Sequence, residues 1–116
     1  LSFEACKSLA FMRVNPRFQE DTYKLNMQKS AQFRALASEL GTSASALAIA
    51  WLLSQGEHVV PIPGTRSVSH LDELVSGAGL SLSPTDLEAI EQALPVGWCC
   101  GDRYTADQWR GPERYC

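Results

Sequence analysis

The sequence predicts an α/β fold that is mostly helical and has one clear strand. Four segments carry apolar residues at helical spacing or begin with capping residues, and a short apolar run lies between the second and the third of them. Gly and Pro residues separate these segments. The order helix, strand, helix is that of an α/β protein, but a single strand cannot form a sheet by itself.

The first strong helix is predicted over Asp21–Leu40. Residues 1–20 precede it, and we expect them to form a loop because their apolar residues have no period. Gly41 follows the helix and predicts a left-handed C-terminal stop. One apolar stripe of this helix should face the core. It has the spacing i, i+3, i+4 and i+7 and consists of Phe33, Leu36, Ala37 and Leu40.

The second helix is predicted to begin at Thr42 or Ser43. From Ala46 to Leu53 every residue is apolar, so this stretch has no polar face. A helix that is apolar all round needs packing partners on more than one side. We therefore expect Trp51 to lie in a core, and we expect the chain to lack part of the structure around this helix.

The predicted strand, His58–Ile62, leads into the most informative turn of the sequence. Its short apolar run is typical of a buried parallel strand. Pro63 and Gly64 then break the chain before a new helix begins, and free N–H groups at a helix start favour an anion. Arg66 adds a guanidinium that suits phosphate oxygens. The alternative is an ordinary turn with one solvated arginine.

Two further helices complete the prediction. The third spans Ser67–Ser76 and is expected to end at Gly77 and Gly79. The fourth begins with Ser83 as its N-cap and is stopped by Pro95. The predicted buried faces consist of Leu71, Leu74 and Val75 in the third helix and of Leu87, Ile90 and Leu94 in the fourth.

Composition restricts the classes of function. Hydrophobic residues make up 45% and charged residues 20% of the 116 residues, which is typical of a globular domain. The net charge of −3 argues against non-specific binding to nucleic acid or to an acidic membrane surface. No apolar run approaches the roughly 18 residues of a membrane span. We therefore expect neither a nucleic-acid nor a membrane partner.

The four cysteines do not form a metal motif. They are Cys6, Cys99, Cys100 and Cys116, with no C-x-x-C pair and no histidine at ligand spacing. No zinc site is predicted. Adjacent cysteines suit an ordinary disulfide poorly, so reduced thiols and a cytoplasmic location are expected.

Several segments together resemble the aldo-keto reductase family. Residues 61–66 (PIPGTR), followed by 70–73 (HLDE), resemble the last strand–helix unit of its barrel. Four other segments match in the family's order: 15–19 resembles the loop after the seventh strand, 46–53 the seventh helix, 82–87 the start of the C-terminal helix, and 101–104 the tail.

The resemblance implies that residues 1–116 are a partial aldo-keto reductase domain, the C-terminal portion of a (β/α)8 TIM barrel, with 96–116 as its tail. A complete barrel takes about 250 residues. The family's members reduce aldehydes and ketones with NADPH. Their catalytic Asp, Tyr, Lys and His lie on earlier strands, so the resemblance assigns no catalytic residue here. The implied partners are a small carbonyl substrate and a missing barrel half.

The resemblance also places the adenosine 2′-phosphate and the adenine of NADPH on the last strand–helix unit. The residues it assigns to the cofactor are Pro63, Gly64, Thr65, Arg66, His70 and Glu73. Gly64 and Thr65 would offer a backbone N–H and a hydroxyl to the phosphate. Arg66 would add charge, and Glu73 would approach the adenine.

Two positions depart from the family's pattern. His70 stands where the family usually has an arginine, and Leu74 stands where it usually has an asparagine. A histidine is mostly neutral at pH 7, and a leucine cannot hydrogen-bond to adenine. The sequence therefore predicts weaker NADPH affinity than that of a typical member.

Two other functions are compatible with parts of the sequence. Residues 36–43 and the helix after them resemble a helix-turn-helix DNA binder, but that helix offers Ala, Leu, Ile and Trp where base reading needs Arg, Lys, Asn or Gln. The apolar second helix also fits a non-catalytic interaction module, such as one half of a split barrel. The residues alone do not separate this alternative from a truncated gene product.

Overall fold

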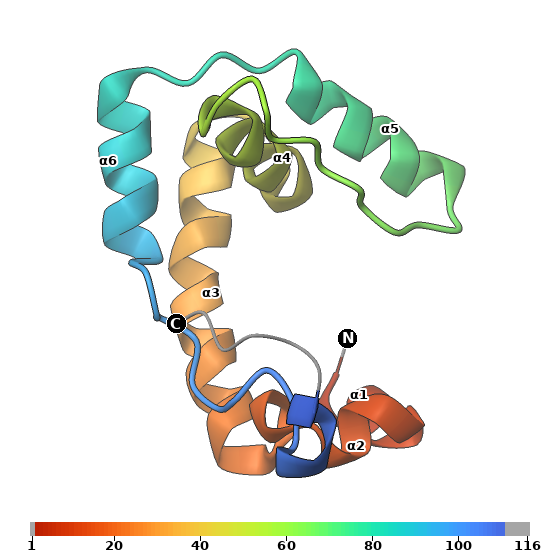
Figure 1. The fold of residues 1–116 in the computed structure, drawn as a ribbon. Helices are drawn as coiled ribbons and strands as arrows, with labels where there is room; N and C mark the ends of the chain where they lie inside the picture. Colours follow the sequence, from red (N-terminus) through yellow and green to blue (C-terminus); the bar gives the residue numbers. More distant parts are fainter. Residues whose placement is uncertain (1, 111–116) are drawn as a thin grey trace. The chain divides into compact units, whose positions relative to one another are not determined.

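The computed structural model describes residues 2–110, and the end of the predicted tail, with Tyr115 and Cys116, lies outside the described residues. Every regular element within 2–110 is helical (Figure 1). The elements are α1 (Phe3–Ser8), α2 (Ala10–Val14), the 3-10 helix η1 (Pro16–Phe18), α3 (Glu20–Glu39), α4 (Ala44–Ser54), α5 (Val68–Ala78), α6 (Pro84–Ala93) and the 3-10 helix η2 (Ala106–Arg110).

The chain divides into two compact units. One contains the residues up to Ser30 together with those from Pro95 onwards, and the other is Ala31–Leu94. Helix α3 begins in the first unit and ends in the second. We refer to them as the tail unit and the core unit.

The core unit is built where α3, α4 and α6 meet. Ala37, Leu47 and Ile90, one from each helix, are buried against one another. Figure 1 shows α6 alongside the end of α3 that belongs to this unit. The predicted α3 stripe is confirmed, because the partly buried residues packed on this cluster are Phe33, Leu36, Leu40, Ala44, Leu80 and Leu82.

Helix α5 packs closely on α4 at Gly77. A Cβ built on Gly77 would lie 2.9 Å from Ala46 Cα, so only a glycine fits here. The prediction that Gly77 ends the helix is therefore wrong: the helix runs on to Ala78, and Gly79 is its C-cap. Gly77 serves the close approach of two helices instead of a turn.

Capping motifs mark the end of α3 and the start of α4. Gly41 has φ +68°, the N–H of Thr42 donates to the Ala37 carbonyl (2.9 Å), and the N–H of Gly41 donates to the Ser38 carbonyl (3.0 Å). This pair of bonds is a Schellman motif and confirms the predicted stop. Ser43 caps α4, because its hydroxyl accepts from the Ala46 N–H at 3.1 Å.

Helix α6 starts with a capping box, and its predicted N-cap, Ser83, is confirmed. The Ser83 hydroxyl accepts from the Asp86 N–H (3.2 Å), and the Ser83 N–H donates to Asp86 Oδ2 (2.8 Å). Two hydrogen bonds from Ser83 lower the pKa of Asp86, because they favour its charged form. The bond from the hydroxyl has the larger effect and the bond from the backbone N–H the smaller.

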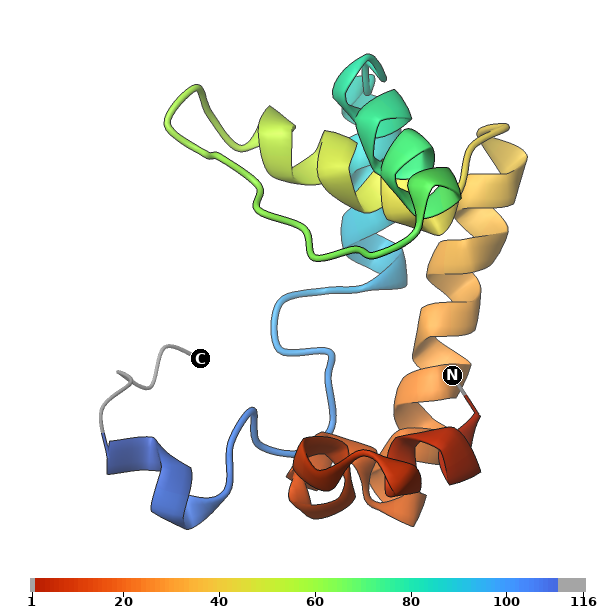
Figure 2. The ribbon, with the colours of Figure 1, turned by 90° about the vertical axis from the view of Figure 1, so that its right-hand side faces the viewer.

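The predicted strand is wrong for the described structure. Residues 58–62 have no regular secondary structure, and Val60 and Ile62 are 77% and 92% exposed. Figure 2 shows the segment as an open loop between α4 and α5. A strand needs a neighbouring strand for its backbone hydrogen bonds, and residues 2–110 provide none.

The apolar faces predicted for α4 and α5 are covered only in part. Ala46, Leu47, Ile49 and Ala50 are buried, but Trp51 is exposed, so the prediction of a core position for it is wrong. Leu71 and Val75 on α5 are also exposed. The packing of α4 on α5 and on the α3–α6 cluster covers one side of each helix.

No single helix within 2–110 is long and apolar enough to cross a membrane. Helices α3 and α4 reach that length and composition only together, and the chain bends by 88° between them.

The segment predicted as a loop over residues 1–20 is largely helical within the described residues 2–20. Ser2 caps α1 by accepting from the Ala5 N–H (3.2 Å), and α2 and η1 follow directly. Helices of five and six residues are too short to show a period in the sequence, which explains the error.

Side chains of the tail unit bind the backbone of residues 98–103. Asn26 on α3 accepts from the Cys100 N–H (2.7 Å) and donates to the Cys100 carbonyl (3.0 Å). The remaining bonds run from Lys29 to the Trp98 carbonyl (2.8 Å), from Arg17 to the Gly101 carbonyl (3.2 Å) and from the buried Asn15 to the Arg103 carbonyl (2.8 Å). The predicted tail is therefore tied to the start of the chain.

Candidate functional site

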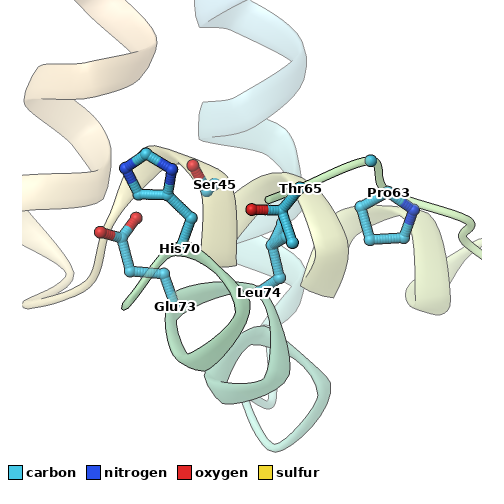
Figure 3. A pocket seen from close by; sticks show the side chains of 7 residues that line it. Ser45, Pro63, Thr65, His70, Glu73 and Leu74 are labelled. Atoms are coloured by element: carbon cyan, nitrogen blue, oxygen red, sulfur yellow. The ribbon is translucent and has the colours of Figure 1, made fainter. Parts of the chain in front are cut away.

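A hollow of about 230 Å³ lies in the core unit between α4, the loop before α5 and α5 itself. Figure 3 shows its side chains, which come from all three segments. Ligand sites for whole small molecules span roughly 300–1,000 Å³, so this hollow suits one part of a larger ligand. Its lining consists of Ser45, Pro63, Gly64, Thr65, His70, Glu73 and Leu74.

Thr65 shapes the loop that leads into α5. Its hydroxyl oxygen accepts from the Ser67 N–H (3.2 Å) and lies 3.3 Å from the Ser67 carbonyl. Ser67 is the N-cap of α5, yet its hydroxyl pairs with that of Ser69 (2.8 Å) and makes no cap bond. The first N–H groups of α5 therefore lack the usual side-chain cap, and they are donors of the kind that bind anions.

His70 and Glu73 are the only residues lining the hollow that can carry a charge. They lie one helical turn apart on α5 and project from the same side of it (Figure 3). Arg66 precedes the helix and is exposed, but it is not part of the lining.

Five of the six residues that the sequence assigns to the cofactor meet at this hollow: Pro63, Gly64, Thr65, His70 and Glu73. Arg66 is the sixth and lies outside the lining. Leu74, which departs from the family's pattern, adds an apolar surface. Ser45 was missed, because it comes from α4 and no local motif connects it with residues 63–74.

A second hollow, of about 200 Å³, lies within the tail unit. It includes none of the residues assigned to the cofactor. Burial raises the pKa of the Cys99 thiol at its edge, although Arg17 nearby acts in the opposite direction. Its lining consists of Arg17, Phe18, Tyr23, Asn26, Met27, Ser30, Trp98 and Cys99.

Comparison with known proteins identifies the family. Residues 4–95 match the family model described as the aldo/keto reductase family. The chain belongs to the aldo/keto reductase family, which confirms the resemblance found in the sequence. Membership implies the TIM barrel fold, which is built from strands and helices. The regular elements of the described residues are all helices.

Three curated relatives align over most of this chain. A probable aldo-keto reductase 1 of Glycine max is 38% identical over 93 residues, which is 80% of this chain and 27% of the relative. The aldo-keto reductase yakc of Schizosaccharomyces pombe, whose name includes NADP(+), is 31% identical over 81% of this chain and 28% of its own length. The aldo-keto reductase str7 of Strobilurus tenacellus is 27% identical over 80% and 28%. This chain thus spans little more than a quarter of these relatives, and no solved structure matches it.

The DNA-binding alternative disagrees with the burial of α4. A recognition helix must present polar side chains to the major groove. Helix α4 contains no Arg, Lys, Asn or Gln between Ala44 and Ser54, and its Leu47 is fully buried in the core unit.

Proposed function

We propose that this chain is part of an NADPH-dependent aldo-keto reductase and that the hollow beside α5 binds the adenosine 2′-phosphate end of the cofactor. The observation that carries the proposal is the meeting of five assigned residues, from a loop and a helix, at one hollow. The name of the fission-yeast relative, which includes NADP(+), also supports it.

The donors at the hollow fit a phosphate. The loop at Gly64 is open, since a Cβ built there would meet nothing within 4 Å, and a phosphate can approach its backbone. The Thr65 hydroxyl and the first N–H groups of α5 would hold the phosphate oxygens. Leu74 would contact the purine through its apolar surface, without selecting it by hydrogen bonds.

The hollow would anchor the cofactor and leave the reaction to other parts of the barrel. NADPH supplies the hydride that reduces the carbonyl group of an aldehyde or ketone. The anchor would fix the far end of the cofactor and thereby limit where its reactive end can lie. Since the resemblance assigns the catalytic residues to earlier strands, we propose that this chain alone is catalytically incomplete. It would work together with the remaining barrel, in the cytoplasm.

Exposed apolar residues support the proposal of a missing partner structure. Val60 and Ile62 belong to the segment that corresponds to the family's last strand, and both are exposed. We propose that residues 58–62 pair with neighbouring strands when the rest of the barrel is present, in the same chain or in a separate one. Parallel strands are usually covered on both faces, which explains their apolar sequence.

Thr65→Val tests the anchor with little change of shape. In the protein of natural length, we expect it to raise the dissociation constant for NADPH about ten- to 100-fold, because a hydrogen bond to a charged group contributes roughly 1.5–3 kcal/mol. Fluorescence titration measures this constant, and Thr85→Val, at an exposed position of α6, is the matched control. Equal constants for both variants, or no NADPH binding by the unchanged protein, would contradict the proposal.

A further inference from the structure

We propose that the hollow of the tail unit is a binding site for a small aromatic carboxylate. Three aromatic side chains, those of Phe18, Tyr23 and Trp98, line this hollow and are half-buried. Its volume of about 200 Å³ is smaller than the roughly 300–1,000 Å³ of sites for drug-sized ligands, so a ligand with a single ring suits it. None of its lining residues belongs to the hollow proposed to hold NADPH, so the two proposals stand independently.

The walls of this hollow favour a planar aromatic group. Aromatic rings pack on one another in offset or edge-to-face arrangements, and Tyr23 already contacts Phe3, whose ring centroid lies 5.3 Å away. The wall formed by residues 98 and 99 is held on α3, because the Asn26 amide binds the Cys100 N–H (2.7 Å) and the Cys100 carbonyl (3.0 Å). A hollow with walls fixed in this way needs little ordering when a ligand binds.

Two cations beside the hollow favour a negative charge on the ligand. Arg17 lines the hollow, and its Nε donates to the Gly101 carbonyl (3.2 Å). Lys29 donates to the Trp98 carbonyl (2.8 Å). Both acceptors are uncharged, and within residues 2–110 neither cation has a carboxylate partner. The guanidinium of Arg17 has further N–H donors in a planar fork, which matches the two oxygens of a carboxylate.

Arg17 is the one positively charged residue that the structure describes in the lining, and no described lining residue is acidic. Glu20, the acid nearest to Arg17 in the sequence, pairs with Lys24 instead (2.9 Å). Burial raises the pKa of the Cys99 thiol, whereas Arg17 and Lys29 both act to lower it. Both cations are therefore close to this thiol, so a carboxylate bound by Arg17 would lie at the Cys99 end of the hollow.

Protection of Cys99 from alkylation reports on the occupancy of this hollow. In the protein of natural length, saturating benzoate should slow the reaction of Cys99 with iodoacetamide about tenfold, with half-maximal protection at roughly 1–10 mM, the affinity expected for so small a ligand. Tandem mass spectrometry distinguishes the products at Cys99 and Cys100. Benzyl alcohol has the ring without the charge, and acetate has the charge without the ring, so each should need a concentration about tenfold higher or more.

Arg17→Gln tests the charged contact, and Arg13→Gln, at an exposed position outside the lining, is the matched control. Arg17→Gln should raise the benzoate concentration for half-maximal protection about tenfold, because solvent partly screens a half-buried cation. Arg13→Gln should leave it unchanged. The proposal is overturned if benzoate does not protect Cys99, if benzyl alcohol protects it equally well, or if the two variants give equal values. The first two of these comparisons need no variant and therefore hold even if Arg17→Gln fails to fold.

Discussion

Gly77 shows at the residue scale how one missing side chain sets the packing of two helices. The position is buried, and the atoms it faces belong to the backbone of α4, which no rotamer change can move away. Helix propensity alone would favour alanine there by about 1 kcal/mol. The close approach outweighs propensity, since the contact leaves no room for a methyl group.

Gly77→Ala is therefore expected to destabilise the chain by about 1–3 kcal/mol, the usual cost of overpacking. Urea denaturation followed by circular dichroism measures the free energy of unfolding. Gly79→Ala is the matched control, because its Cβ would meet only the Ser76 carbonyl oxygen, at 3.8 Å. A Gly77→Ala variant as stable as the unchanged chain would show that α4 and α5 do not pack this closely.

At the element scale, three helix ends were predictable because capping depends on a few neighbouring residues. Ser43, Ser83 and Gly41 act where the sequence places them. The strand predicted at 58–62 does not form in the described residues, because the hydrogen bonds of a strand depend on partners elsewhere in the protein and not on local sequence. The candidate site shows the same division: the loop and α5 residues form a local motif, whereas Ser45 joins them only through the packing of α4 on α5.

The capping box of α6 gives the helix a pH dependence with a definite sign. Asp86 has a lowered pKa in the folded chain, so its stabilising effect is present above its ordinary value of 3.8 and is lost as the pH falls through the lower folded value. Helicity measured by circular dichroism should fall over this acid range, and Asp86→Asn should remove part of that change. Glu88→Gln, in the same helix, is the control, and an identical acid transition in both variants would contradict the capping role.

The attachment of residues 98–103 depends most on Asn26, whose amide binds both backbone groups of Cys100. Asn26→Ala should therefore speed hydrogen exchange of the Cys100 amide about tenfold or more, since it removes that amide's acceptor. Mass spectrometry of the exchanged peptides measures this rate. Gln28→Ala, at an exposed position of the same helix, should leave it unchanged, and similar rates in both variants would argue against the attachment.

At the scale of the whole molecule, family membership accounts for apolar surfaces that the described residues leave uncovered. The chain spans little more than a quarter of its curated relatives, and it exposes apolar side chains on α4, on α5 and in the segment between them. In a TIM barrel, helices pack on a closed parallel sheet, which would cover such surfaces. Under the proposed function, the hollow would be one end of a longer cofactor groove, which agrees with its small volume.

Hydrogen exchange of the protein of natural length, with and without NADPH, tests the central claim most directly. The account predicts slower exchange of the amides of residues 64–70 when NADPH is bound, because the phosphate accepts from the loop and from the first turn of α5. NADH should protect them less, since it lacks the phosphate. Binding of NADPH without any protection of residues 64–70 would contradict the proposed anchor.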